Sequence, residues 1–392
     1  MSTIGQHPFL SFAFRPFYLL AALFAAGAIL LWAGGFQGAP EVSGFLWHAR
    51  EMVWGYTGAI IVSFLLTAVA TWTGLPPLRG IPLALLVLLW LLARAGLYLP
   101  HGLSISAVAS GVFYLASVII FAYPIIKTRN RRNYLPIAAL LLFGITGACF
   151  DGVLLGGQGD ILNALFAGTV MVAAIIGFVG MRVIPFFIAR RLSVKQVASP
   201  QWVMLAGLLM PALAVVLLLS STLPYAVTAL CIATGILFLI QLIRWWERGV
   251  LSEPLLWILF IGFGFTGLGL IAFGWTYTFA PFYLSAATHL ITVGGIGVMT
   301  LGMMARTALG HTGRAMKLST PMPLAFCLMS AAALVRPLAF IDPTPTSPWY
   351  YIGVHGAGTL FALALLLFVY RYLPYLWQER ADAKNNELKI VR

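Results

Sequence analysis

The stretch FLWHAREMVWGYTGAIIVSFLLTAVATW, residues 45–72, decides the fold of this chain. Most of it is an apolar run, and a helix of about 20 such residues crosses the hydrocarbon core of a bilayer. Its first residues carry three ionisable side chains, those of His48, Arg50 and Glu51. Because only 8% of the 392 residues are charged, this group at the head of an apolar run is a candidate functional site.

Eleven further apolar runs fill most of the sequence, which is 61% hydrophobic, well above a soluble domain. The predicted crossings comprise residues 17–36, 46–72, 82–99, 103–126, 134–156, 161–188, 201–221, 223–244, 254–277, 281–309, 322–341 and 349–377. Runs of this length are too long for barrel strands, so helices must satisfy the backbone in lipid. The sequence therefore predicts an all-α integral membrane protein, a single bundle of about twelve transmembrane helices. It forms one domain, 1–392, with an N-terminal segment at 1–16 and a tail at 378–392.

The net charge of +13 is arranged by position along the chain. Lys and Arg residues concentrate in the N-terminal segment, the tail and the connections after every second crossing. The alternate connections carry Glu41, Asp160 and Asp342 and no Lys or Arg. This alternation is the positive-inside pattern, so both termini are predicted to be cytoplasmic. The basic residues are thereby explained by the orientation of the chain in the membrane. We expect contact with membrane lipid and no nucleic-acid partner.

This topology brings the ionisable residues of several crossings to a common depth near the outer side of the bilayer. Ten residues fall at this level: His48, Arg50, Glu51, Arg94, His101, Asp151, His289, Arg336, Asp342 and His355. Ionisable groups within a membrane protein usually face its interior and mark a functional site. The alternative is structural, because arginines near helix ends snorkel to the interface and pair with carboxylates.

His289 is the hardest of these residues to explain by snorkelling. It lies eight residues beyond Pro281, about 12 Å along a helix that rises 1.5 Å per residue. A neutral histidine at this depth is either hydrogen-bonded to a neighbouring helix or bound to a metal. Glycines follow it at 294, 295, 297 and 302, and they permit close helix packing or leave space for a planar ligand.

A weak internal repeat relates two parts of the sequence. Each unit contains a histidine, a Thr-Gly pair and an arginine: His48, Thr73-Gly74 and Arg94, then His289, Thr312-Gly313 and Arg336. The arginine follows the histidine by 46 residues in the first unit and by 47 in the second. Membrane proteins often contain repeats, with sites where the repeats meet.

Several stretches together resemble the NnrS family: FRPF at 14–17, WHAREM at 47–52, WTG at 72–74, RVIPFF at 182–187, and HLITVG with MMARTALGHTGR within 289–314. The resemblance covers essentially the whole chain. It implies a bacterial inner-membrane (cytoplasmic-membrane) protein that contains haem b and copper and is associated with denitrification and protection against nitric oxide. His48, His289 and His311 match histidines of the family pattern, and Arg94 and Arg336 fall where it has arginine.

This chain departs from the family pattern at two positions. Arg50 stands where the family usually has a second histidine, and Asp151 stands where many relatives have histidine. Arginine cannot lose its proton to bind a metal. Haem needs one or two axial ligands, whereas copper favours several imidazoles or sulfurs. The remaining histidines therefore suffice for haem but make a full copper site tight.

The resemblance also gives the outer residues predicted roles. The candidate cofactor-binding residues are His48, His289, Arg50, Arg94 and Arg336, and the candidate metal ligands are His48, His289 and His355. The arginines could pair with haem propionates, because forked guanidinium groups match carboxylates. Glu51 is the candidate catalytic residue, one turn from His48, where it could orient an imidazole or carry protons. His311 is expected in a cytoplasmic turn with a structural role.

The expected function is that of a membrane haem protein in nitric oxide metabolism or nitrosative-stress defence. It would bind or turn over nitric oxide or a product of nitric oxide near the outer side of the bilayer, as a haem-dependent oxidoreductase if it is an enzyme. No soluble donor-docking domain is evident, so a quinol or a redox partner protein would supply electrons. The alternative is a transporter without a redox centre that uses the same polar cluster as its substrate site.

The alternation of basic residues generates a direct test of topology. Reporter fusions at Gln378 and at Asp342 should report a cytoplasmic and an outer location respectively. The opposite result would invert every depth derived from the charge pattern.

Overall fold

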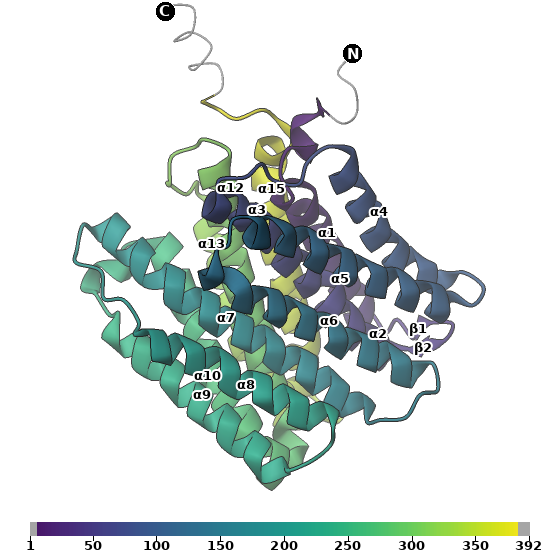
Figure 1. Ribbon diagram of the computed structural model, residues 1–392. Helices are drawn as coiled ribbons and strands as arrows, with labels where there is room; N and C mark the ends of the chain where they lie inside the picture. The colour runs from purple at the N-terminus through teal and green to yellow at the C-terminus, as the bar shows by residue number, and fades with distance from the viewer. Residues whose placement is uncertain (1–5, 383–392) are drawn as a thin grey trace, which may run out of the picture.

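Twelve helices long and apolar enough to cross a membrane run through residues 6–382, the part of the chain that the computed structural model describes (Figure 1). The crossings are α1 (Phe14–Ala33), α2–η3–α3 (Gly44–Thr73), α4–η4 (Ile81–Tyr98), α5 (Gly102–Lys127), η5–α6 (Arg131–Leu154), α7 (Ile161–Leu192), α8 (Gln201–Leu219), α9 (Pro224–Arg244), α10 (Pro254–Phe279), η7–α11–η8–α12 (Pro281–His311), α13–η9 (Pro321–Phe340) and α14–η10–α15 (Pro348–Trp377). The predicted all-α class and the twelve crossings are confirmed.

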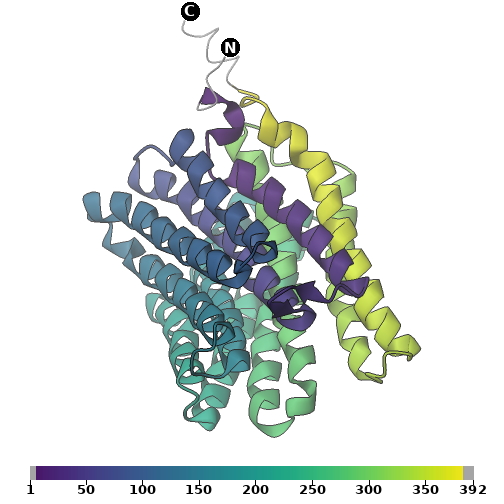
Figure 2. The same ribbon diagram turned by 90° about the vertical axis from the view of Figure 1, so that its right-hand side faces the viewer.

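The first and last crossings lie side by side, so the chain closes on itself. The start of α1 and the end of α15 lie at the top of both views in Figures 1 and 2. Arg15 Nη1 donates to the carbonyl oxygens of Leu376 at 3.1 Å and Gln378 at 2.6 Å. The start of the first crossing and the end of the last crossing are therefore on the same side of the membrane. That this side is the cytoplasmic one stays a prediction. Most of the predicted tail lies outside the described residues.

A short hairpin joins the far end of α1 to the second crossing. Strands β1 (Gly38–Ala39) and β2 (Val42–Ser43) pair antiparallel, with Gly38 opposite Ser43. Gly38 has a φ of +104°, and a Cβ there would lie 2.1 Å from the Val42 carbonyl oxygen. Only glycine fits this position, and the turn it allows sets where the second crossing begins.

Three crossings contain a π-helical segment, and each segment begins at or near a predicted site residue. They are η3 (Glu51–Thr57), η8 (Leu290–Gly297) and η10 (Ile352–Gly356). The other crossings of residues 6–382 contain none. π-Helices are rare and occur frequently at functional sites, because their i→i+5 bonds widen the turn and redirect side chains. Neighbouring side chains satisfy carbonyls of η3: the Tyr114 hydroxyl donates to Trp54 O (2.6 Å), and Trp90 Nε1 donates to Gly55 O (3.0 Å).

The glycines that follow His289 pack the tenth crossing against α10. A Cβ at Gly294 would lie 2.6 Å from Phe265 Cγ, and one at Gly295 would lie 2.6 Å from Thr266 Oγ1. Of the two explanations that the sequence left open, close helix packing is the one that the structure supports at these positions.

Close approach of α9 and α10 should make one further glycine irreplaceable. A Cβ at Gly235 would lie 2.4 Å from the carbonyl oxygen of Gly267. Gly235→Ala should therefore lower the free energy of unfolding by about 1–3 kcal/mol through overpacking. Gly27→Ala is the matched control, because a Cβ at Gly27 meets nothing within 4 Å. Thermal unfolding in detergent measures both variants, and equal midpoints would contradict the expectation.

Candidate functional site

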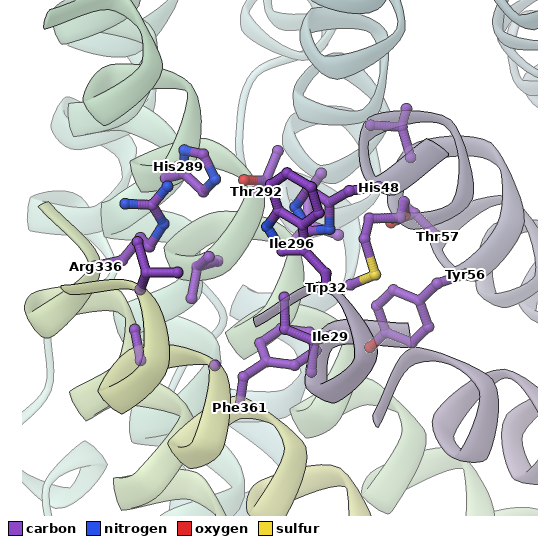
Figure 3. A pocket seen from close by; sticks show the side chains of 16 residues that line it. Ile29, Trp32, His48, Tyr56, Thr57, His289, Thr292, Ile296, Arg336 and Phe361 are labelled. Atoms are coloured by element: carbon purple, nitrogen blue, oxygen red, sulfur yellow. The ribbon is translucent and has the colours of Figure 1, made fainter. Parts of the chain in front are cut away.

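A cavity lies among the first, second, tenth, eleventh and twelfth crossings. We call it the histidine cavity. Its polar lining includes His48 near the end of α2 (Gly44–Arg50), His289 at the end of α11 (Leu284–His289) and Arg336 at the start of η9 (Arg336–Phe340), together with Thr57 and Thr292. Figure 3 shows these side chains around the same space. The structure thus brings together three residues that the sequence predicted from three separate crossings.

The His289 ring is oriented by its own helix. Its Nδ1 lies 2.7 Å from the carbonyl oxygen of Ser285. Because a carbonyl oxygen can only accept, Nδ1 carries the proton, and the neutral ring keeps a lone pair on Nε2. Metal-binding histidines are commonly fixed in this way, with one ring nitrogen bonded to a backbone carbonyl and the other free to ligate.

His48 is held by stacking. Its ring lies 5.1 Å from that of Trp32 between centroids, with an angle of 11° between the planes. Its Nδ1 is buried without a hydrogen-bond partner. A buried polar atom of this kind is unfavourable in a folded protein and is one of the marks of a site that binds something.

Arg336 brings a positive charge to the cavity. Its Nη1 is buried without a hydrogen-bond partner, and its guanidinium lies 5.4 Å from the centre of the Phe340 ring. No carboxylate within residues 6–382 forms an ion pair with it, and no acidic residue lines the cavity. Because arginine keeps its charge at any ordinary pH, the cavity carries an uncompensated positive charge.

Four other charged residues of the predicted site, Arg50, Glu51, Arg94 and Asp151, form a separate buried network, whereas Asp342 bonds to Thr344. Arg50 holds Asp151 with two bonds, Nε to Oδ1 at 2.6 Å and Nη2 to Oδ2 at 2.8 Å, and its Nη1 donates to Glu51 Oε1 at 2.7 Å. Glu51 Oε2 in turn lies 2.5 Å from Arg94 Nε. Both arginines donate to Ser110 Oγ, at 3.3 and 3.1 Å. We call Ser110 and the four charged residues the ion network.

The ion network is electrically balanced, with two arginines and two carboxylates that are each less than 10% exposed. Ions taken out of water are costly unless each is paired with a counter-ion. Arg50 and Arg94, predicted as propionate partners, are thus paired within the protein. Glu51, the predicted catalytic residue, does not line the histidine cavity. Glu51 is three residues beyond His48 and would lie on the same face of a regular α-helix. It begins the π-helical segment η3, whose wider turn changes the direction of the side chains.

The sequence profile of the NnrS proteins matches residues 8–380. The chain belongs to the NnrS family. A comparison with curated proteins gives no match. With twelve candidate crossings, the protein is a multi-pass membrane protein, and its family fits a role related to nitric oxide.

The other four histidines of this NnrS protein, His7, His101, His311 and His355, do not line the histidine cavity. His355 packs on the Tyr351 ring at 4.5 Å and lines an adjoining, more polar cavity beside the β1–β2 hairpin, on the other side of Trp32. His311 is the last residue of α12 (Val298–His311), and its ring packs beside those of Phe12 and Phe14 at 5.8 and 5.7 Å, towards the end of the bundle that holds the termini. The structural role expected of His311 stays a prediction.

The internal repeat extends to the backbone. In both units a π-helix follows the histidine, the glycine of the Thr-Gly pair has a φ of +70°, and a 3₁₀ turn begins at or near the arginine. The units differ three residues after the histidine, where the first has Glu51 and the second has Thr292. Glu51 neutralises Arg94, and the corresponding Arg336 has no such partner.

Sequence reasoning missed two residues of the site. Trp32 stacks on His48 from a first crossing that reads as uniformly apolar, so no sequence signal marked it. Thr292 could have been found, because aligning the two repeat units from their histidines shows that it replaces a glutamate.

The ion network predicts that the stability of the protein depends steeply on the balance of charge within the network. Asp151→Ala leaves Arg50 without its bidentate partner and should destabilise the protein by about 3–5 kcal/mol. The double change Arg50→Met with Asp151→Leu removes both charges and leaves Glu51 paired with Arg94, so it should recover most of that loss. Unfolding in mixed detergent micelles measures the difference. A double variant as unstable as Asp151→Ala would show that charge balance is not the cause.

Proposed function

We propose that this protein is a haem-containing membrane protein of nitric oxide metabolism, and that the histidine cavity holds haem b. The observation that supports this most is the combination of two histidines with unengaged ring nitrogens and one unpaired arginine around one cavity. Haem carries an iron that takes imidazole ligands and two propionates that take arginine. The polar lining of the cavity offers partners of both kinds.

His289 and His48 are the candidate iron ligands, and an iron held by only one of them would keep a position free for nitric oxide. The hydrogen bond from His289 Nδ1 to Ser285 O leaves Nε2 free for iron and fixes the plane of the ring. His48 Nδ1 has no other partner in the described structure, and ligation would satisfy the side chain. His355 is separated from this space by Trp32 and Val354, which line both cavities, so it is not assigned to the haem.

Arg336 would bind a propionate. It is the arginine of the predicted set that lines the histidine cavity, and it lacks a carboxylate partner among residues 6–382. Arg50 and Arg94 would instead hold the second crossing in place through the ion network. In this proposal Glu51 is a structural partner of the two arginines.

Bound haem would supply an iron that binds nitric oxide or exchanges one electron. The protein would position the iron with two crossings and exclude water with the apolar lining, which includes Ile296 and Phe361. Electrons would come from a quinol or a partner protein in the bacterial inner membrane. Copper, which the family resemblance implies, is not part of this proposal.

The axial ligands can be tested by spectroscopy. Purified protein should show a Soret band, and His48→Ala or His289→Ala should remove or shift it, because each loses an imidazole. His7→Ala, which changes a histidine in the N-terminal segment, is the control and should leave the spectrum unchanged. Full retention of an unshifted band in both cavity variants would refute the ligand assignment. A protein without any Soret band would favour a transporter that uses the same cavity.

The repeat supplies a sharper test of Arg336. Thr292→Glu places a carboxylate where the first unit has Glu51, so it should pair with Arg336 and compete with a propionate. We expect the variant to raise the unfolding temperature of the haem-free protein and to retain less haem than wild type. Thr292→Gln matches the size without the charge and should retain more haem than Thr292→Glu. Equal haem content in all three proteins would exclude Arg336 as the anion partner.

A further inference from the structure

A second cavity lies further along the same crossings. It is lined by α1, α3 (Gly58–Thr73), α7 and α12 (Val298–His311), and we call it the apolar cavity. Its lining is formed by Ile, Leu, Val, Met, Phe and Gly residues, with Tyr18 and Thr300 as the polar exceptions, and it includes no charged side chain. The space is large enough to hold more than one water-sized molecule.

A hydrogen-bonded pair links the lining of the apolar cavity to that of the histidine cavity. Tyr56 lines the histidine cavity, Thr300 lines the apolar cavity, and their hydroxyl oxygens lie 2.9 Å apart. Thr300 Oγ1 donates to the carbonyl oxygen of Gly297, so the Tyr56 hydroxyl is the donor in this pair. The second and tenth crossings contribute to both cavities, which lie at successive levels of these two helices.

The apolar cavity opens at the surface of the bundle between α3, α7 and α12. Phe64 on α3, Val179 and Val183 on α7 and Met303 on α12 are its half-buried lining residues. All four side chains are apolar, so the opening is suited to molecules that dissolve in hydrocarbon.

We propose that the apolar cavity is a binding site for small, uncharged, apolar molecules such as diatomic gases, which enter from the lipid and pass to the histidine cavity when the Tyr56–Thr300 contact opens. Apolar cavities of this kind stay dry and bind apolar guests such as xenon. Ions and strongly hydrated molecules are excluded, because the lining offers too few hydrogen-bond partners to replace their water. The delivery of such a molecule to haem rests on the proposed function, whereas its binding in the apolar cavity does not.

Xenon is the probe for the cavity itself, because it needs no haem. Xenon-pressurised crystals of the full chain should show xenon between α3 and α7. Val179→Trp fills the mouth and should remove that peak. Val216→Trp is the matched control, since Val216 is 50% exposed on α8 and lies outside the cavity. Absence of xenon from wild type, or an undiminished peak in Val179→Trp, would overturn the proposed binding site.

The passage between the cavities is tested by the rate at which carbon monoxide binds to reduced, haem-loaded protein in lipid nanodiscs after flash photolysis. Val179→Trp should slow association, and Val216→Trp should not. Tyr56→Phe keeps the ring but removes the hydrogen bond, so it should speed association. Thr300→Val tests the same contact from the other side if Tyr56→Phe folds poorly. Unchanged rates in the mouth and contact variants would overturn the route. A protein that binds xenon but shows no Soret band would retain the cavity and reject the haem.

Discussion

An ion inside a membrane bundle requires a counter-ion, and this requirement organises the end of the molecule opposite the termini. Arg50, Glu51, Arg94 and Asp151 meet it completely, because each guanidinium has a carboxylate and each carboxylate has a guanidinium. The result fixes the second crossing against the third and fifth. Arg336 does not meet the requirement within the described residues, because no carboxylate there pairs with it, and this is why the proposed function assigns it an anionic ligand.

The two repeat units show how one backbone pattern can serve two purposes. Both use a histidine, a π-helix and an arginine in the same order, so their crossings enter the bundle in similar ways. One residue makes the difference. With Glu51 the first arginine becomes part of the scaffold, and with Thr292 the second is left available. The two units therefore differ in charge balance at one position although their backbones are alike.

The sequence predicted the positions of residues along the crossings better than it predicted which way their side chains point. Hydropathy defines crossings because lipid imposes a minimum apolar length, and the crossings 201–221 and 254–277 end within two residues of α8 and α10. The common depth of the ionisable residues followed from the same reasoning. Which residues face each other depends on rotation about each helix axis, and a π-helical segment changes that rotation without any compositional signal. The pairing of Arg50 with Asp151, 101 positions away, was for this reason beyond sequence reasoning.

The bond from Arg15 to the end of α15 has a consequence for how the chain is ordered. Because an even number of crossings returns the chain to its starting side, the two ends meet, and the bundle has no first or last helix in space. Joined ends and a new opening in the connection between α7 and α8 would give a circular permutant with the same neighbours around every helix. The order of the helices along the chain is thus separable from their arrangement in space. The histidine cavity is built from the first two and the last three crossings, and in the permutant these would be five consecutive crossings.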